Sequence, residues 1–540
     1  MEQTEKYSGA RLVLRWLKKI GAEKLFIVSG TDYAAFIEEY AKGGEDLPEL
    51  IVVPHEITAV SAAIGYSLGG KVGVVAVHTT PGTANALGGI MNSYTSRIPL
   101  IVIAGRSPYT EEGHRGSRNL RIHWTQEARD QGEMVRQWVK WDFEIRRVEQ
   151  IPEVMYRAYQ IMMSEPRGPV YIVIPREVSI EEGKDKDFPL SYCEPGATTE
   201  AIVKARDMIN EAENPVIITW RAGRRKEWFE SLTRFADKFN IPVINYVGEV
   251  VNYPSTGPMA LDKIDLSKVD LAIVVEAEVP WIPKRTKFKG KIIKVDVEPL
   301  YTYIPYYGFY CDLCIQSTVS DFFDKLVKIE IKIRDKNWII EEKRKQEELK
   351  AKEIEKLRDK KPIHPKYLSF EIGKLGLTIF NEYPFNPKYA KLDDYGSYYH
   401  DLSAGYLGWA LGASVGYKLA TGKDVVVTIG DGSFIFGVPE AFYYIASQSP
   451  VLVVIYDNGG WLAVQEAVEE VFPEGIAVMK RLFPGANFRR YNIGETVKAF
   501  NGFYKLIEEP SEIESALHEG LKEMRKGKIA VIQVIVDRIR

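Results

Sequence analysis

Short apolar runs alternate with helix-like stretches along most of the 540-residue chain. Runs of this length are typical of buried strands, and the segments between them have the pattern of helices that cover a sheet. Alternation of strand and helix predicts parallel sheets with helices on both faces. We therefore expect an α/β fold built from doubly wound parallel sheets.

The apolar runs fall into three blocks, in agreement with ~150 residues per domain. In the first block, strands are expected at 25–30, 50–56, 72–78, 99–105 and 168–178. In the second and third blocks, they are expected at 215–220, 241–249, 271–278, 291–299, 424–433, 450–460 and 529–537. A polar linker at 179–200 and a densely charged, solvated helix within 335–362 separate the blocks. The expected domains are 1–182, 183–330 and 363–540, with a charged helical linker at 331–362.

Charge and hydropathy exclude several classes of protein. Lysine and arginine total 71 and aspartate and glutamate 74, so the formal net charge is −3. This balance gives no basis for a nucleic-acid or membrane partner, because both usually require a basic excess. No apolar run reaches the ~18 residues of a membrane span, and the N-terminal residues lack the apolar core of a signal peptide. We expect a cytoplasmic protein.

The three cysteines cannot form a disulfide framework in a chain of this length. Cys311 and Cys314 form a single CxxC pair, and Cys193 lies far away in sequence, which argues against a zinc site. We expect Cys311 and Cys314 to be core side chains on one strand. A local disulfide is the alternative, as found in proteins of hyperthermophiles.

The strongest chemical signal is Gly430-Asp431-Gly432-Ser433 at the end of an apolar strand. A second strand ends in Asp457-Asn458-Gly459-Gly460, and Asn458 follows Asp431 by 27 residues. Ligands of open parallel sheets bind at the carboxyl ends of strands. Carboxylate, amide and carbonyl oxygens are ligands that Mg²⁺ takes together with phosphates. The glycines let backbone N–H groups approach phosphate oxygens, and Ser433 adds a hydroxyl. Each motif alone is typical of a tight turn, but together they predict a metal–diphosphate site.

The paired motifs resemble the signature of the thiamine diphosphate enzymes that act on 2-oxo acids. The resemblance implies that Asp431 and Asn458 are side-chain ligands of Mg²⁺ and that Gly460 supplies its backbone carbonyl. It covers essentially the whole chain. It implies a pyrimidine-binding domain, a central Rossmann-like domain and a diphosphate-binding domain, in that order.

In this family a glutamate hydrogen-bonds N1′ of the cofactor's aminopyrimidine and so activates the cofactor as an acid–base relay. The strand expected at 50–56 ends at Glu56, and the following helix looks like the family's segment at Ala59, Ala62, Ala63 and Gly65-Tyr66. The resemblance implies that Glu56 is the activating residue. On its own, a glutamate at a strand end is usually solvated.

Residues 397–416 resemble the stretch that bends the cofactor in these enzymes. Leu407 takes the position of the large apolar residue under the cofactor, and Gly405 that of the carbonyl that accepts from N4′. A plain core position is the alternative for Leu407. The family pattern Gly-Gly-Leu-Gly here contains Tyr406, which adds bulk near the cofactor.

Residues 78–106 resemble the benzoylformate decarboxylase branch, and this implies that His78 is an active-site histidine. A structural histidine is the alternative. Thr31 falls where that branch has a substrate-contacting serine. The segment that ends at Gln126-Glu127 instead resembles acetolactate synthases, which places Gln126 at the site.

Two features depart from that branch. Its second active-site histidine comes from the central domain, but residues 183–330 contain no histidine. The role is either empty or filled from the segment 113–127, which carries His114 and His123. The residues after Asn458 fit neither branch, and we expect Trp461 and Gln465 to border the substrate pocket.

The resemblance implies thiamine diphosphate- and Mg²⁺-dependent cleavage of a 2-oxo acid. CO₂ leaves, and the resulting enamine is either protonated to an aldehyde or ligated to a second carbonyl compound. The sequence leaves these fates open. FAD is not expected, because the central block has a short loop at 247–266 and few glycines.

Two alternatives belong to other classes. A 2-hydroxyacyl-CoA lyase would carry a basic C-terminal extension, for which the chain leaves no room after its last expected strand. A non-catalytic relative could use the same fold, but it would not need Glu56, Asp431 and Asn458.

The expected oligomer follows from the positions of these residues. Glu56 lies in the first block, whereas Asp431 and Asn458 lie in the third. In the superfamily the two domains of one site come from different subunits. The resemblance therefore implies a homodimer or homotetramer with active sites between subunits.

Overall fold

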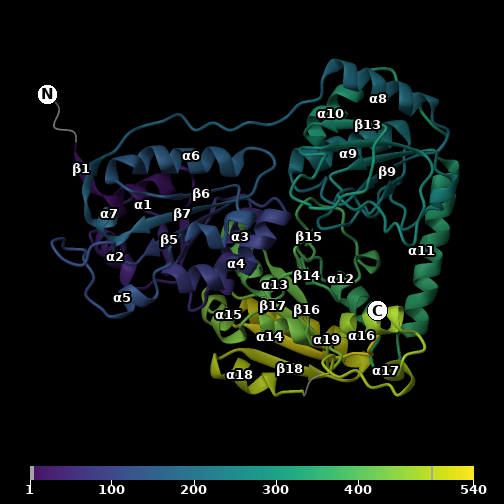
Figure 1. The fold of residues 1–540 in the computed structure, drawn as a ribbon. Helices are drawn as coiled ribbons and strands as arrows, with labels where there is room; N and C mark the ends of the chain where they lie inside the picture. The colour runs from purple at the N-terminus through teal and green to yellow at the C-terminus, as the bar shows by residue number, and fades with distance from the viewer. Residues whose placement is uncertain (1–4, 488–489, 540) are drawn as a thin grey trace. The chain divides into compact units, whose positions relative to one another are not determined.

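The computed structural model describes residues 5–487 and 490–539 (Figure 1). The chain divides into two compact units. Unit 1 comprises Met1–Cys193, Leu402–Lys505 and His518–Gln533, and unit 2 comprises Glu194–Asp401, Leu506–Leu517 and Val534–Arg540. In the described part of the chain, every helix is too short or too polar to cross a membrane.

The N-terminal part of unit 1 contains a six-stranded sheet of order β3-β2-β4-β5-β7-β6. Its strands are β2 (Lys24–Ile27), β3 (Glu49–Val52), β4 (Gly73–Val77), β5 (Leu100–Arg106), β6 (Trp141–Glu144) and β7 (Pro169–Pro175). All neighbouring strands pair in parallel. From β2 the chain goes outward to β3 and returns on the other side of β2 as β4. The point between β2 and β4 is therefore the topological switch point, where sheets of this kind bind ligands.

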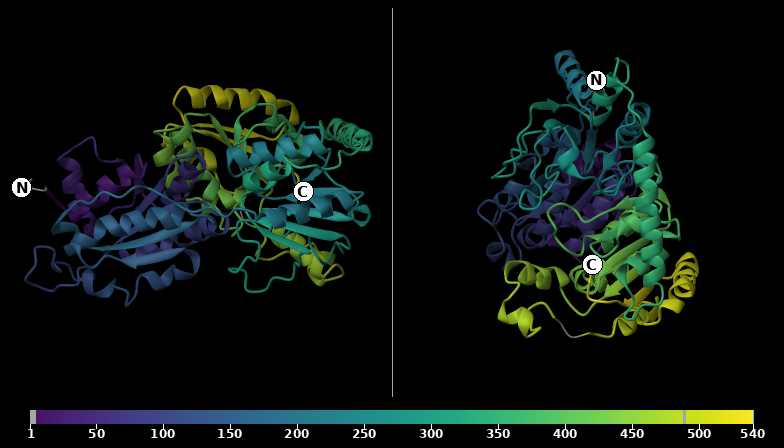
Figure 2. Two further views of the ribbon diagram at one scale, coloured as in Figure 1. Left: turned by 90° about the horizontal axis from the view of Figure 1, so that it is seen from above. Right: turned by 90° about the vertical axis from the view of Figure 1, so that its right-hand side faces the viewer.

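Helices cover both faces of this sheet (Figures 1 and 2). One layer contains α1 (Gly9–Lys19), α2 (Ala34–Ala41) and α6 (Ile151–Met163), which pack on one set of alternate strand residues. The other contains α3 (Glu56–Leu68) and α4 (Thr79–Thr95). There, Phe26 contacts Tyr66 of α3 at 5.8 Å between ring centroids, and Tyr171 hydroxyl lies 2.7 Å from Thr83 of α4. Because successive strand residues face opposite sides, the sheet is doubly wound.

The remaining α-helices and strands of this part are short. They are α5 (Ile122–Thr125), α7 (Arg176–Ile180) and an antiparallel pair of β1 (Lys6–Ser8) with β8 (Glu182–Lys184).

The C-terminal part of unit 1 contains neighbouring strands in the order β16-β17-β19-β18. They are β16 (Val425–Gly430), β17 (Leu452–Asp457), β18 (Phe503–Ile507) and β19 (Ala530–Ile535). Strands β16 and β17 are parallel, with Thr428 opposite Val454. The helices are α13 (Trp409–Thr421), α14 (Asp431–Phe436), α15 (Pro439–Ala446), α16 (Leu462–Val471), α17 (Ile476–Met479), α18 (Ile493–Ala499) and α19 (Ile513–Arg525), of which the first five residues belong to unit 2.

Helices α3 and α13 pack backbone against backbone. A Cβ atom added at Gly65 would lie 1.8 Å from the carbonyl oxygen of Ala413, and one at Gly416 would lie 1.8 Å from that of Ala62. Two helices approach this closely only where glycine removes the side chain. The contact joins the helix that begins at Glu56 to the helix that follows Gly405–Gly408.

Unit 2 contains a five-stranded parallel sheet of order β10-β9-β11-β12-β13. Its strands are β9 (Pro215–Thr219), β10 (Val243–Ile244), β11 (Leu271–Val275), β12 (Lys291–Asp296) and β13 (Leu313–Gln316). Helices α8 (Thr199–Glu211), α9 (Lys226–Phe239) and α10 (Val319–Leu326) share its main core. Strand β10 is much shorter than the run expected at 241–249, because Asn245 adopts the left-handed conformation (φ +56°) and turns the chain.

Unit 2 also holds a second parallel pair, β14 (Thr378–Glu382) with β15 (Tyr398–Tyr399), and helices α11 (Asn337–Leu357) and α12 (Pro365–Gly373). Ile339 and Ile354 are buried on the charged helix α11. The prediction of an α/β fold with parallel, helix-covered sheets is confirmed.

One prediction within unit 2 is wrong. Cys311 and Cys314 are joined by a disulfide, with Cα atoms 5.7 Å apart, and are not two core side chains. Strand β13 lies at the edge of its sheet, and its alternation buries Ile315 while Cys314 is exposed. A side chain that faces outward on an edge strand cannot belong to the core.

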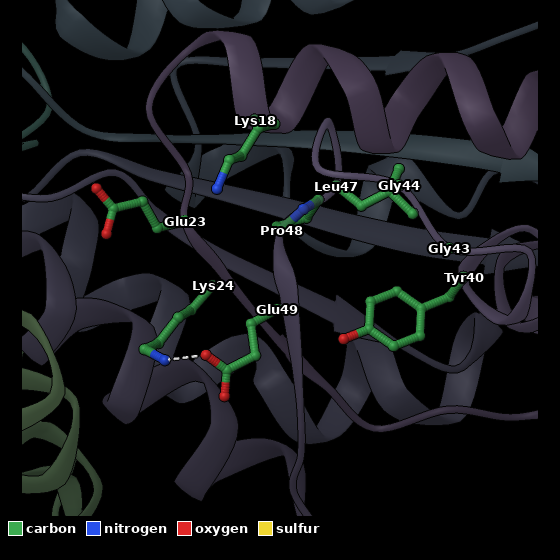
Figure 3. A pocket seen from close by; sticks show the side chains of 9 residues that line it. All are labelled: Lys18, Glu23, Lys24, Tyr40, Gly43, Gly44, Leu47, Pro48 and Glu49. Atoms are coloured by element: carbon green, nitrogen blue, oxygen red, sulfur yellow. Dashed lines mark hydrogen bonds and ion pairs between the residues drawn. The ribbon is translucent and has the colours of Figure 1, made fainter.

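A surface pocket of about 500 Å³ lies in unit 1 (Figure 3). Its lining includes Lys24 and Glu49, which form an ion pair and are the first residues of β2 and β3. The pocket is therefore at the amino edge of the sheet, opposite the edge where ligands of such sheets bind.

Candidate functional site

Three of the expected site residues follow neighbouring strands of the first sheet. Thr31 begins the 3₁₀ turn Thr31–Tyr33 after β2, Glu56 follows β3, and His78 directly follows β4. Because β3, β2 and β4 are adjacent and parallel, these residues lie at one edge of the sheet, around its switch point.

The central contact at this edge joins His78 to Asp32. Nδ1 of His78 lies 2.6 Å from Oδ1 of Asp32. The Asp32 side chain is only 2% exposed, whereas that of His78 is 24% exposed. The hydrogen bond from Asp32 is the main cause that raises the pKa of His78. The geometry therefore fixes Nδ1 of His78, and the Gln126 side chain approaches the same ring closely enough to raise its pKa.

The turn after His78 is strained. Thr79 has φ +37°, a region that β-branched residues rarely adopt. The backbone N–H of Thr79 donates to Oδ2 of Asp32 at 3.3 Å. Asp32 thus stabilises both the imidazole and the strained start of α4, a type of strain that is common at functional sites.

Thr31 and Gln126 complete the polar surroundings. Oγ1 of Thr31 lies 3.4 Å from Nε2 of His123, which is buried. Nε2 of Gln126 donates to Oγ of Ser107 at 3.4 Å. Oε1 of Gln126 is buried without a hydrogen-bond partner among the described residues, and the Gln126 side chain adds to the rise in the pKa of His78. The sequence-predicted residues Thr31, His78 and Gln126 therefore share one site.

Glu56 does not end a strand as expected. Strand β3 ends at Val52, and Glu56 is the first residue of α3, which His55 caps by accepting from the N–H of Ile57 at 3.3 Å. A helix can begin there because the cap satisfies one of its free N–H groups.

The Glu56 carboxylate is buried rather than solvated. Its Oε2 accepts from Nδ2 of Asn85 at 3.1 Å, and a Cβ atom added at Gly82 would lie 3.2 Å from its Oε1. Asn85 and Gly82 both belong to α4, the helix that His78 precedes. Glu56 also raises the pKa of His78 through its charge. Glu56 and His78 are therefore neighbours at the same edge.

The segment before α13 is held by α4. The Asn92 side chain donates to the carbonyl of Tyr406 at 2.9 Å and accepts from its N–H at 3.1 Å. The Tyr406 ring covers Gly88, where an added Cβ atom would lie 2.1 Å from the ring. Gly405, at φ +69°, precedes this clamp, and Leu407 after it is half-buried. Leu407 is therefore not a fully buried core residue.

The second part of the expected site lies at the ends of β16 and β17. Asp431, the first residue of α14, is 3% exposed, and its carboxylate accepts from the N–H groups of Gly432 and Gly459, each at 3.0 Å. Burial, together with the nearby charge of Asp457, raises the pKa of Asp431 to about 7. Two carboxylates that lie close together and away from water repel each other, and a bound cation would relieve that repulsion.

Asp457 orders the loop that carries Asn458. It accepts from the N–H of Gly459 at 3.1 Å and from the Gln533 side chain at 2.6 Å. Oδ1 of Asn458 accepts from the N–H of Gly460 at 3.2 Å. Gly459 adopts φ +74°, which glycine alone adopts without strain. The structure thus brings Asp431 and the Asn458 loop together, as the paired motifs predict.

Two known domain families match the chain. The model described as "Thiamine pyrophosphate enzyme, N-terminal TPP binding domain" matches residues 7–134, and "Thiamine pyrophosphate enzyme, C-terminal TPP binding domain" matches residues 385–534. Together they span just over half of the chain. The chain belongs to the thiamine pyrophosphate enzymes.

Individual relatives of this thiamine pyrophosphate enzyme are distant but similar along their length. Acetolactate synthase isozyme 3 large subunit of Escherichia coli (strain K12) is 24% identical over 582 residues, which covers 99% of this chain and 95% of that protein. A 2-hydroxyacyl-CoA lyase of Oryza sativa subsp. japonica is 23% identical over 590 residues, covering 98% and 96%. The solved structure of benzoylformate decarboxylase from Polynucleobacter necessarius superimposes with a TM-score of 0.81 at 21% identity, covering 98% and 99%. That superposition shows the same fold of three α/β parts.

The oxygen donors of this thiamine pyrophosphate enzyme fit a magnesium diphosphate. Within residues 5–487 and 490–539, no three His, Cys, Asp or Glu side chains cluster as a metal site. Mg²⁺ with a diphosphate needs fewer carboxylates, since amide and carbonyl oxygens and phosphates complete its shell. Asp431, Asn458 and the Gly460 carbonyl offer that set. Beside Gly430 the described residues leave 4 Å of free space around an added Cβ atom, which is room for a phosphate.

Two residues expected at the pocket border lie on exposed structure. Trp461 is 37% exposed and contacts Phe436 at 6.0 Å between ring centroids. Gln465 on α16 bonds Glu469 at 2.8 Å. All residues of α16 are at least partly exposed.

Four residues for which the sequence predicted no role of their own hold this site in place: Asp32, Asn85, Asn92 and Asp457. Each lies inside or beside a stretch that the sequence marked as functional, so proximity in sequence was the available signal. Their partners, however, lie between 2 and 314 residues away, and sequence spacing does not reveal such pairs.

Proposed function

We propose that this thiamine pyrophosphate enzyme uses Mg²⁺ and decarboxylates a 2-oxo acid. The fragment left after loss of CO₂ either takes a proton and leaves as an aldehyde or adds to a second carbonyl compound, as in an acetolactate synthase. The observation that carries the proposal is the meeting of buried Glu56 and the His78–Asp32 pair at the switch point of one sheet.

Each residue has a task in this proposal. Asp431, Asn458 and the Gly460 carbonyl would hold Mg²⁺, and Gly430, Gly432 and Ser433 would approach the diphosphate. Gly405 and Leu407 would contact the other end of the cofactor. When bound, thiamine diphosphate supplies a carbon nucleophile and an acceptor for the electrons of decarboxylation.

Glu56 would hold and return one proton at the cofactor's ring nitrogen. Its burial and its single hydrogen bond from Asn85 leave one carboxylate oxygen for that contact. His78, Thr31 and Gln126 would bind the 2-oxo acid at the same edge. Tyr406, whose backbone N–H and carbonyl are both bonded by the Asn92 side chain, would limit the space beside the substrate.

The further assignments follow from the same proposal. The enzyme is a homodimer or homotetramer, with active sites between subunits, and acts in the cytoplasm on small molecules, with neither nucleic acid nor membrane as partner. FAD is not expected as a cofactor of this chain. Of the two fates, ligation is supported by similarity to a protein named acetolactate synthase, and aldehyde release by the fold shared with one named benzoylformate decarboxylase.

The test is incubation of the full chain with thiamine diphosphate, Mg²⁺ and a panel of 2-oxo acids, with CO₂ and organic products measured together. We expect CO₂ from at least one acid, and loss of that signal in Glu56→Gln. Cleavage of 2-hydroxyacyl-CoA without CO₂ release would instead establish the lyase. Cofactor binding without turnover of any substrate would contradict the proposed activity and favour a non-catalytic role.

A further inference from the structure

Helices α11 and α12 of unit 2 (Figure 1) border a pocket of about 570 Å³. Its lining residues recur every three or four positions from Glu347 to Arg358 and from Tyr367 to Lys374, so one face of each helix lines the pocket. Residues 388–391 form a third wall. Every lining residue belongs to unit 2, whereas the residues assigned above to the cofactor and substrate belong to unit 1. The volume lies within the range of ~300–1,000 Å³ that small-molecule sites occupy.

The three walls of this pocket are joined to one another. The Glu353 carboxylate on α11 accepts from Nζ of Lys366 on α12 at 2.7 Å and from the hydroxyl of Tyr389 at 2.5 Å. Helix α12 also touches the third wall directly, because a Cβ atom added at Gly373 would lie 2.7 Å from Cβ of Ala390. The pocket is therefore preformed, as small-molecule sites usually are.

Aromatic side chains make up much of the lining. They are Tyr246, Tyr367, Phe370 and Tyr389. Tyr246 and Tyr367 are buried, and the other two are half-buried. The rings of Tyr367 and Phe370 lie 6.5 Å apart between centroids, with 28° between their planes. Rings in such positions bind planar apolar groups by stacking and edge contacts, so the lining favours a ligand that carries an aromatic ring.

Four charged side chains of the lining have no ion-pair partner in the part of the chain that the structure describes. Two are positive, Arg358 and Lys388, and two are negative, Glu355 and Glu514. All four are exposed and can reach a ligand. Because the unpaired charges are equal in number and opposite in sign, they complement a ligand with one charge of each sign better than a simple anion or cation.

Each of the remaining charged side chains of the lining already has a partner: Glu347 with Lys343, Lys350 with Asp262, Glu371 with Lys374, and Lys391 with Asp393. Their charges are therefore compensated within the protein. Burial and the Glu371 charge raise the pKa of Tyr367 to about 12, and Arg358 opposes this rise because it lies close to the Tyr367 hydroxyl. One of the unpaired cations is thus adjacent to the aromatic lining.

We propose that this pocket of unit 2 binds a small aromatic zwitterion with the chemistry of an aromatic α-amino acid. Arg358 and Lys388 bind its carboxylate, Glu355 and Glu514 bind its ammonium group, and the aromatic side chains contact its ring. The site is additional to those of the cofactor and the substrate, and the inference does not depend on the proposed reaction.

The test is calorimetric titration of the full chain with three ligands that share one ring system. They are L-tryptophan, indole-3-propionate, which lacks the ammonium group, and tryptamine, which lacks the carboxylate. We expect one tryptophan site per chain and about 10-fold weaker binding of each analogue, the lower end of the range for a hydrogen bond to a charged group. The absence of a saturable tryptophan site at millimolar concentrations would overturn the proposal, as would an analogue that binds as tightly as tryptophan.

Substitutions at the unpaired charges locate the ligand. Arg358→Gln and Lys388→Gln should each weaken tryptophan and indole-3-propionate by about 10-fold and leave tryptamine nearly unchanged. Glu355→Gln and Glu514→Gln should instead weaken tryptophan and tryptamine and leave indole-3-propionate nearly unchanged. Ala351→Phe adds a ring to the pocket from an exposed position of α11 and should abolish the binding of all three ligands.

The controls lie on the same helix outside the lining. Arg344→Gln and Glu348→Gln each remove one charge of an exposed ion pair, and Leu349→Phe enlarges a side chain that is 61% exposed. These variants should bind all three ligands as the wild type does. Losses in the pocket variants that match the controls, or that are the same for all three ligands at all four charged positions, would refute the assignment. Because the readout is binding alone, a chain that releases no CO₂ from any 2-oxo acid would refute the proposed function and leave this test intact.

Discussion

The contact between α3 and α13 gives a prediction whose magnitude follows from the structure. The change is Gly65→Ala, which places a methyl group where the backbone of α13 lies. The new Cβ atom would lie 1.8 Å from the carbonyl oxygen of Ala413 and 2.5 Å from its carbonyl carbon, whereas ordinary contacts begin at 3.4 Å. Because both atoms are backbone, no side-chain rotation can relieve the clash.

Two effects oppose each other in this variant. Overpacking costs ~1–3 kcal/mol, and a rigid helix backbone places this site at the upper end. Alanine gains ~1 kcal/mol over glycine in a helix. The net loss is therefore about 2 kcal/mol, which at about 2–4 °C per kcal/mol lowers the melting temperature by about 4–8 °C.

The assay is differential scanning calorimetry of the full chain, with Gly308→Ala as the control. Around Gly308 the described residues leave 4 Å of free space for an added Cβ atom, so this variant should melt within about 1 °C of the wild type. A Gly65→Ala protein that melts at or above the wild-type temperature would show that helix propensity outweighs packing here, and the close approach of α3 and α13 would be refuted.

Three further predictions concern activity, pH and assembly. Glu56→Gln should fold and bind cofactor but lose at least ~100-fold in turnover, the usual range for a general acid–base group; activity within about threefold of the wild type would remove Glu56 from the mechanism. Desolvation lowers the pKa of His400 from 6.5 to about 4. As pH falls below 6.5, His400 therefore takes up a proton in the unfolded chain before it does so in the folded chain. Stability is therefore full above pH 6.5 and declines by about 3 kcal/mol as pH falls to 4, and urea titrations of His400→Gln should show a shallower loss. Mixed dimers of inactive Glu56→Gln and inactive Asp431→Ala chains should recover part of the activity if each site takes one domain from each subunit, and no recovery in confirmed mixed dimers would place both domains of a site in one chain.

The fold was largely predictable because its main determinants are local. Apolar runs such as 72–78 and 99–105 become β4 and β5 with each bound shifted by one residue. The apolar runs predicted the wrong strand ends where the local backbone conformation turned the chain earlier. Asn245 ends β10 after two residues, and the cap at His55 converts an expected strand end into the first turn of α3.

The candidate site was predictable only in part, for a related reason. Residues with a chemical signature, such as Glu56, Asp431 and His78, can be proposed from neighbouring motifs. Their supporting partners cannot, because a partner is defined by distance in space. Asn92 reaches Tyr406 across 314 residues, and the disulfide of the CxxC pair depends on which face of an edge strand turns outward.

The central claim is that this chain holds thiamine diphosphate through Mg²⁺ at the ends of β16 and β17. Calorimetric titration of thiamine diphosphate into the full chain, with Mg²⁺ and then with EDTA, tests it directly. The account predicts one Mg²⁺-dependent site per chain, and at a free cofactor concentration of about 100 times Kd a gain of about 2.7 kcal/mol in stability. It also predicts that Asp431→Ala abolishes the dependence on Mg²⁺. Binding that is absent, or that is unchanged by both EDTA and Asp431→Ala, would contradict the account.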